Sequence, residues 1–166
     1  MRRGNDITMK NLFLVACMLL GSSLSAQTAV DLGGITADPD DPVEISADSL
    51  SVDRDSGTAV FSGQVVIGQG DLRIAADQVR VVYDDISGDI IELSMSGGIT
   101  LVTLDEQAEA QSATYDLDSG NLVLIGDVLL TQGRSALSAD RMVVNLDDGT
   151  AQMEGRVRSI FQQDGP

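Results

Sequence analysis

Apolar and polar residues alternate along most of the segment 43–161. Ala59 and Phe61 lie on one side of an extended chain, and Val65 continues that apolar side. A period of two residues is typical of a β-strand with one buried face, and no segment keeps the 3.6-residue period of an amphipathic helix. Residues 106–111 have a helical composition but are too few to hold a helix alone. The pattern predicts an all-β domain of many short antiparallel strands.

The predicted strands belong to a unit that recurs about every 30 residues. Each copy opens with an Ala-Asp pair (Ala-Gln in one copy), reaches a turn glycine, and then has a second glycine two positions before a β-branched residue. These positions are Ala47-Asp48, Gly57 and Gly63; Ala76-Asp77, Gly88 and Gly97; Ala110-Gln111, Gly120 and Gly126; and Ala139-Asp140, Gly149 and Gly155. Imperfect copies in phase are typical of one supersecondary unit stacked on itself.

The alternation changes phase at each Ala-Asp pair. Ile45 and Ala47 share one face, whereas Leu50 and Val52, at even-numbered positions, would point to the opposite face of an unbroken strand. A bulge or corner between them would return all four side chains to one face, as sheets need where they bend. The sequence therefore predicts strands bent at regular positions, with aliphatic side chains on one side, as in a jelly roll or an open, rolled sheet.

Residues 1–26 have the features of a secretory signal peptide. Arg2, Arg3 and Lys10 form a basic start, and the apolar run Leu12–Leu20 is too short to cross a bilayer as a mature helix. Small residues precede a predicted cut after Ala26. The sequence therefore predicts export, to a periplasm.

Two alternatives remain within this segment. Met9 is a possible start, because the sequence from Met9 onward is already a complete signal. The stretch Leu14–Cys17 also fits a lipoprotein box, which would leave Cys17 lipidated. The short apolar run ahead of Cys17 favours simple cleavage.

The rest of the chain divides into three parts. Residues 27–42 are acidic and interrupted by Pro39 and Pro42, so we expect a flexible leader. Residues 43–161 form the single β domain, and residues 162–166 form a C-terminal tail.

Charge and composition exclude several classes of function. The net charge of −16 disfavours binding to nucleic acid or to an anionic membrane surface. The chain has no His, and its single cysteine is Cys17, which excludes Cys/His zinc sites and Ser-His or Cys-His nucleophiles from the mature domain. Carboxylate chemistry stays open, but no acidic residue lies in an evident apolar pocket. We predict no catalytic residue, no metal site and no cofactor.

Several stretches resemble the OstA-like domain family, the LptA type, of periplasmic lipopolysaccharide transport proteins. The most specific is the string AVFSGQVVIGQG at 59–70, which is flanked by Ala-Asp pairs. The resemblance covers essentially all of residues 43–161 and is carried by Ile45–Asp48, Ala59–Gly70, Ile74–Asp77, Ala113–Asp116, Leu122–Val128 and Leu137–Arg141.

The resemblance implies an open V-shaped antiparallel β-jellyroll that carries lipopolysaccharide by the acyl chains of lipid A. It implies transfer from the inner to the outer membrane by end-to-end assembly. The partners it implies are an LptC-like protein anchored in the inner membrane and an LptD-like barrel protein of the outer membrane. This chain is more acidic than familiar members, so head-group contacts by Lys or Arg are not carried over.

The aliphatic face would supply the walls of such a groove. Burial of an acyl chain contributes about 0.8 kcal/mol per CH₂. The predicted groove residues are Val52, Phe61, Val65, Ile67, Ile74, Val81, Met95, Ile99, Leu101, Tyr115, Leu124, Val128, Val144 and Met153.

The first and last strands would be free edges, at which strand addition produces a head-to-tail contact that propagates. The predicted assembly residues are Val43, Ile45, Ala47, Arg156, Val157, Arg158, Ile160 and Phe161.

Three other interpretations stay open. In the first, which the pattern alone favours, the apolar faces pack into a closed core, as in a structural or adhesive β-repeat protein. The acidic turns at 53–57, 116–120 and 147–149 would bind Ca²⁺ in such a protein, although Asp and Gly are also ordinary turn residues. A carboxylate-dependent hydrolase is the third, but no spacing selects an Asp/Glu pair.

Overall fold

The computed structural model describes residues 29–31 and 35–161, which form a single antiparallel sheet of 11 strands. No helix in this part of the chain is long and apolar enough to cross a membrane. The predicted signal peptide at 1–26, with Cys17, and the tail at 162–166 lie outside the described residues. The strands are β1 (Ala29–Asp31), β2 (Glu44–Ser46), β3 (Ser49–Asp53), β4 (Thr58–Gln69), β5 (Leu72–Tyr83), β6 (Ile90–Val102), β7 (Glu106–Asp116), β8 (Asn121–Gln132), β9 (Ser135–Asn145), β10 (Thr150–Glu154) and β11 (Arg158–Ile160).

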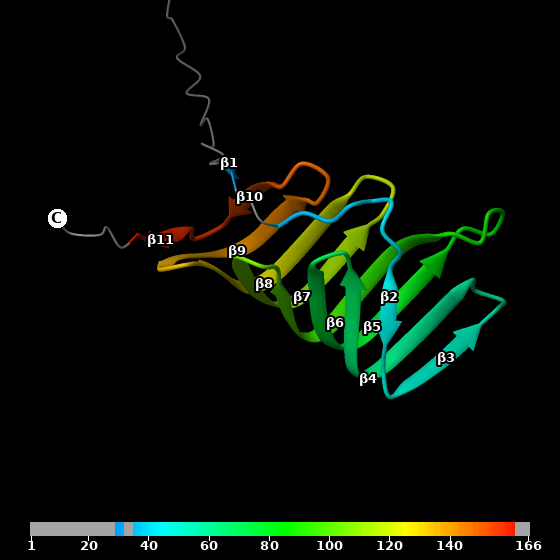
Figure 1. The fold of residues 1–166 in the computed structure, drawn as a ribbon. Helices are drawn as coiled ribbons and strands as arrows, with labels where there is room; N and C mark the ends of the chain where they lie inside the picture. The colour runs from blue at the N-terminus through cyan, green and yellow to red at the C-terminus, as the bar shows by residue number, and fades with distance from the viewer. Residues whose placement is uncertain (1–28, 32–34, 162–166) are drawn as a thin grey trace, which may run out of the picture.

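Neighbouring strands in the sheet are mostly neighbours in sequence. The order is β1-β10-β9-β8-β7-β6-β5-β4-β2, with β3 beside β2 on β4, and β11 beside β10 on β9. Figure 1 shows β3 at one end of the molecule and β11 at the other. The sheet does not close on itself, so the prediction of an all-β, open antiparallel architecture is confirmed.

The sheet bends along one line that crosses every long strand. The register between partners shifts at Ser62/Val65, Ala75/Gln78, Ser96/Ile99, Glu109/Ser112 and Ile125/Val128. These shifts coincide with the Ala-Asp (or Ala-Gln) pairs and the second glycines, so the predicted bulges are confirmed. The predicted short strands are the halves of longer ones, up to 13 residues in β6.

The bend divides the sheet into two walls of a V. The first wall contains β3, β10 and the halves of β4 to β9 that continue between them, such as 58–62 of β4. The second wall contains β2, β11 and the remaining halves, such as 65–69 of β4. The rim of each wall is the row of turns that joins its strands.

Each bend depends on a close approach between an Ala-Asp pair and a glycine of the next strand. Asp48 N–H donates to the Gly63 carbonyl (2.9 Å), and Asp140 N–H donates to the Gly155 carbonyl (3.0 Å). A Cβ added at Gly63 would lie 2.5 Å from Asp48 Oδ2, and one at Gly155 would lie 2.5 Å from Asp140 Oδ2. Only glycine leaves room for the carboxylate, which explains why the two motifs repeat together.

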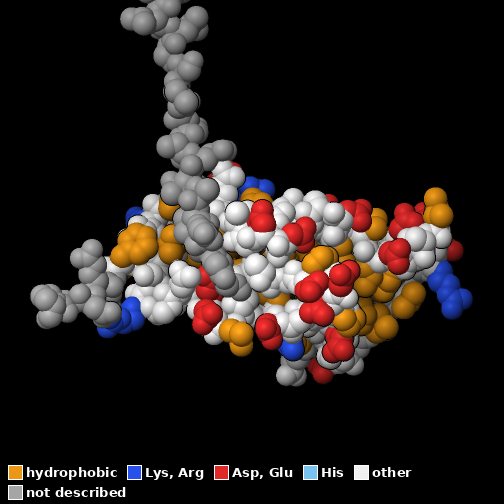
Figure 2. Space-filling model, turned by 45° about the horizontal axis from the view of Figure 1, so that its top comes forward, with side chains coloured by type: hydrophobic (Ala, Val, Ile, Leu, Met, Phe, Trp, Pro, Cys, Tyr) orange, Lys and Arg blue, Asp and Glu red, His pale blue; other side chains and the backbone are white. Residues whose placement is uncertain are grey.

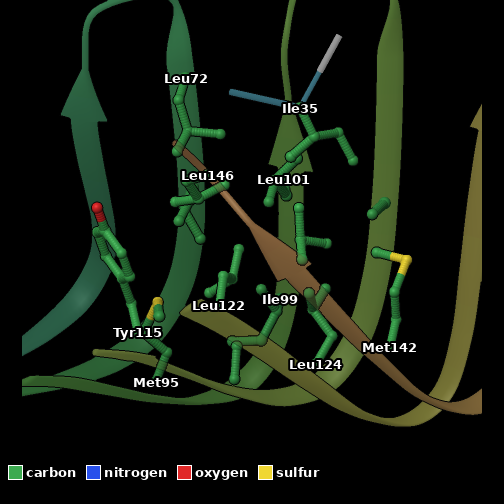
Figure 3. Packing of buried hydrophobic residues seen from close by; sticks show 14 of the residues in the cluster. Ile35, Leu72, Met95, Ile99, Leu101, Tyr115, Leu122, Leu124, Met142 and Leu146 are labelled. Carbon is green, nitrogen blue, oxygen red and sulfur yellow. The ribbon is translucent and has the colours of Figure 1, made fainter. Parts of the chain in front are cut away.

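The core is the inner face of the V. Side chains of both walls are buried there against one another in a single hydrophobic cluster, part of which is shown in Figure 3. Its largest fully buried members include Ile74, Leu93, Leu101, Leu122, Leu124, Leu130 and Met142.

A matched pair of glycines tests this account of the bend. Gly97 and Gly98 both have positive φ (89° and 86°), but an added Cβ meets Asp77 at Gly97 and nothing within 4 Å at Gly98. We expect Gly98→Ala to lower the free energy of unfolding by about 1–2 kcal/mol through backbone strain alone. Gly97→Ala should lower it further, because strain and overlap add. Urea denaturation followed by circular dichroism measures both, and equal losses would contradict the role given to Asp77.

Candidate functional site

The predicted groove residues lie on the inner face of the V. Apart from Val52 and Phe61, they are buried in the hydrophobic cluster. The first wall contributes Val52, Phe61, Val81, Met95, Tyr115, Leu124, Val144 and Met153, and the second wall contributes Val65, Ile67, Ile74, Ile99, Leu101 and Val128. The structure therefore brings them together on one surface, where the inner faces of the two walls pack on each other.

This surface is organised as apolar rows that cross every long strand. Directly paired residues lie about 5 Å apart across a sheet. One row on the first wall is Leu50, Phe61, Val79, Met95, Ala113, Leu124, Met142 and Met153. One row on the second wall is Ile45, Ile67, Ile74, Leu101, Ala108, Leu130 and Leu137. Each row is a continuous aliphatic path along the molecule.

The rows reach the surface at the end that holds β3. Leu50 and Val52 pair with the inward-facing Phe61 and Ala59, yet 55% and 61% of their surface is exposed. Figure 2 shows hydrophobic side chains gathered at this end of the molecule. The inner face is thus open at the β3 end.

A segment of the N-terminal leader crosses the mouth of the V, as the light-blue trace in Figure 1 shows. We call residues 35–42 the belt. Ala37 N–H donates to the Leu146 carbonyl on the first rim (3.0 Å). Gln69 Nε2, at the second rim, donates to the carbonyls of Asp38 (3.1 Å) and Asp41 (3.3 Å).

The belt also contributes to the core. Ile35 has 0% of its surface exposed, and Figure 3 shows its side chain entering the cluster that contains Leu101 and Leu146. Ala37 is buried as well. This packing differs from the flexible leader that we expect from composition, because an Ile and an Ala two residues apart supply a short apolar face that acidic neighbours obscure.

Two buried polar residues, Gln69 and Glu106, lie at the second rim. Tyr115 OH, from the first wall, donates to Gln69 Oε1 of the second wall (3.2 Å), and burial raises the pKa of this phenol. Gln69 therefore binds Tyr115 through its oxygen and the belt through its nitrogen. In the sequence, Gln69 stands out only as part of the family-like string 59–70, since its contacts are with residues far away in the chain.

Glu106 is the second buried polar residue, and no local pattern in the sequence marks it. Its side chain lies on the second rim and is 3% exposed. Gln132 Nε2 donates to Glu106 Oε1 (2.6 Å), while Glu106 Oε2 is buried without a hydrogen-bond partner among the described residues. Burial, with a smaller contribution from the neighbouring Asp105, raises the pKa of this carboxyl.

The acidic turns use their carboxylates to hold their own backbones. Asp53 Oδ1 accepts a hydrogen bond from Asp55 N–H (2.9 Å), and Asp116 Oδ1 accepts from Ser119 N–H (2.9 Å). The Ser56 hydroxyl and the neighbouring N–H groups lower the pKa of Asp53, and Ser119 lowers that of Asp116. Across residues 29–31 and 35–161, no three acidic, Cys or His side chains are placed to hold a metal ion.

The predicted assembly residues lie at opposite ends of the sheet. Val43, Ile45 and Ala47 lie in or beside β2, whereas Arg156, Val157, Arg158, Ile160 and Phe161 lie in or beside β11. In the described part of the chain, β2, β3 and β11 each pair on one side only, while β10 has β1 on its outer side.

Glu106 generates a pH-dependent prediction. Because its folded pKa is raised, the folded protein loses stability as pH rises from the ordinary carboxyl pKa through the higher folded one. Glu106→Gln removes this titration and should gain about 1 kcal/mol at pH 7, because the amide carries no charge and so avoids the desolvation of a buried carboxylate. Denaturant titrations between pH 4 and pH 8 would show a flatter profile. Glu109→Gln removes the same charge from the exposed face of β7 and is the matched control; an unchanged profile in Glu106→Gln would contradict the assignment.

Comparison with known proteins agrees with this architecture. The crystal structure of LptH, described as the LptA homologous periplasmic component of the lipopolysaccharide transport device of Pseudomonas aeruginosa, superimposes with a TM-score of 0.68. The match has 19% sequence identity and covers 76% of this chain and 99% of that one. The prediction of an LptA-like jellyroll is therefore confirmed at the level of the fold.

Sequence relatives are consistent with the structural match. The lipopolysaccharide export system protein LptA of Escherichia coli (strain K12) is 26% identical over 132 residues, which cover 75% of this chain and 70% of LptA. An uncharacterized protein of Rhizobium meliloti (strain 1021) is 27% identical over 156 residues, 87% of this chain and 84% of that protein. The model of the family described as LptA/(LptD N-terminal domain) LPS transport protein matches residues 44–154. The chain therefore belongs to this family of lipopolysaccharide transport proteins, which is a family of carriers and not of enzymes.

Proposed function

We propose that the protein is a periplasmic carrier that holds lipopolysaccharide by its lipid A acyl chains against the inner face of the V. In this proposal it passes the lipid from the inner towards the outer membrane within an end-to-end assembly. The observation that supports it most directly is the set of apolar rows that cross the sheet and reach the surface at Leu50 and Val52.

The chemistry of the rows suits acyl chains. An acyl chain that lies along the rows replaces contacts between the walls with contacts of similar apolar character. Its own burial contributes about 0.8 kcal/mol per CH₂, before the lost wall contacts are subtracted. Met95, Met142 and Met153 occupy one row, and their flexible thioether side chains adapt to chains of different shape. A carrier of this kind requires smooth apolar walls more than a specific polar site.

The sheet edges suit the assembly. The β2–β3 edge of one copy and the β10–β11 edge of another can pair antiparallel, which extends the two walls across the joint. Such a contact joins two different surfaces, so it propagates as a filament. Exposed Glu44 on β2 and exposed Arg158 on β11 supply opposite charges to the two sides. The LptC-like and LptD-like partners would pair with the same edges.

A structural β-repeat protein is the second candidate, because the inner faces of the walls pack on each other. Mass spectrometry of lipid extracted after mild purification from a Gram-negative periplasm separates the two functions. We expect a stoichiometric lipid A species. A lipid-free protein that also takes up no added lipopolysaccharide would contradict the carrier function and favour a closed structural core.

A pair of surface variants tests the location of the groove. Val52→Asp places a charge at the open end of the inner face, where 61% exposure makes unfolding a small risk. We expect about a tenfold weaker affinity for lipopolysaccharide, equivalent to 1.4 kcal/mol of lost apolar contact. Phe61→Asp, one strand further in, should weaken it more.

Val102→Asp is the matched control for these variants. Val102 follows the buried Leu101 on β6, so it faces outward, and 40% of its surface is exposed. The affinity should stay unchanged in this variant. Equal affinities of Val52→Asp and Val102→Asp, measured by titration with fluorescent lipopolysaccharide, would overturn the groove assignment.

A further inference from the structure

The belt and β1 occupy two places that the proposed function assigns to other molecules. Resting on that function, we infer that the N-terminal segment is an exchangeable occupant: the belt is displaced when acyl chains enter the groove, and β1 is displaced when a second copy of this chain joins at β10. Lipid loading and end-to-end assembly are then coupled through one segment.

The belt covers the groove with few contacts. Ile35 and Ala37 are its buried apolar side chains, whereas Thr36, Asp38 and Pro39 are exposed. Among the described residues, the belt is hydrogen-bonded to the rims from Ala37 N–H to Leu146 and from Gln69 to two belt carbonyls. A segment held by so few groups belongs to the low-stability end of a fold and opens locally. The aliphatic side chain of Ile35 fills space between the walls, and an acyl chain in the groove would take the same space.

The strand β1 occupies the outer edge of β10. It pairs through three residues, Ala29–Asp31, with positions 150–152 of β10. β10 has five residues, and β3, the strand that an adjoining copy would present to it, also has five. Exchange of β1 for the β3 of a second copy therefore keeps the edge of β10 paired and joins the first walls of the two copies.

Chain connectivity links the two exchanges. β1 ends at Asp31, and Ile35 follows four residues later, a span of at most about 14 Å when extended. Release of Ile35 by incoming acyl chains therefore loosens β1, and release of β1 by a second copy loosens Ile35. By linkage, each ligand raises the affinity of the protein for the other by the same factor.

A reversible lock on the belt provides the main test. Ala37→Cys with Leu146→Cys places two thiols where Ala37 N–H already meets the Leu146 carbonyl at 3.0 Å. Cys17 is the only native cysteine and lies within the predicted signal peptide, so the mature variant should form one disulfide. We expect oxidation to lower the affinity for fluorescent rough lipopolysaccharide about tenfold and to prevent lipid-promoted assembly, measured by sedimentation velocity. Reduction of the same sample should restore both, which excludes misfolding as the cause.

Single substitutions test the opposite direction. Ile35→Asp weakens the belt and should raise the affinity for lipopolysaccharide and lower the concentration needed for assembly. Thr36→Asp adds the same charge at the adjacent exposed position and should change neither. Ile35→Val, which keeps an apolar side chain, should resemble the unaltered protein.

The outcomes separate this inference from the proposed function. Absence of lipopolysaccharide binding by the unaltered protein contradicts the carrier function itself. If the unaltered protein binds lipid and the oxidised lock binds and assembles equally well, the belt is a fixed part of the fold and the inference is wrong. Loss of lipid binding in the oxidised lock with assembly unchanged overturns the coupling.

Discussion

The close approach of an Ala-Asp (or Ala-Gln) corner to a glycine in the next strand is the constraint on which this structure depends. The pairs Asp48 and Gly63, Asp77 and Gly97, Gln111 and Gly126, and Asp140 and Gly155 all leave no room for a Cβ on the glycine. Each corner inserts a bulge and changes the phase of the alternation, so both halves of a strand present apolar side chains to one side. Without the corners the sheet would be flat, and half of its aliphatic residues would face water.

A single bent sheet gives the molecule a long apolar interior and free edges at the same time. A closed barrel would remove the edges. The open V keeps rows such as Phe61–Val79–Met95 continuous from one strand to the next. A second copy that adds to the edge would continue the same rows. The geometry that stabilises one copy therefore also suits a path through several copies.

Local periodicity accounts for what the sequence predicts well. The alternation around Ala59 and the repeated glycines depend on neighbours within a few residues, so strands, corners and inward-facing residues are predicted correctly. The contacts of Ile35, Gln69 and Glu106 connect residues that are distant in the chain, and no local pattern reports them. Exposure is equally non-local: Val52 and Val81 both face inward, but only Val52 lies on an edge strand, where no further strand covers it.

A lipid carrier must also be stable when it carries nothing. An apolar trough of this length, empty and open, would expose a surface of the kind that drives aggregation. Here the walls pack on each other and Ile35 completes the cluster, so the unloaded protein buries most of its inner face and leaves apolar side chains of that face exposed at Leu50 and Val52. The apparent affinity for lipid is then the difference between lipid contacts and these internal contacts. A difference of this kind can be small even when the burial of each acyl chain is strongly favourable, and a small difference allows a carrier both to accept lipid and to release it.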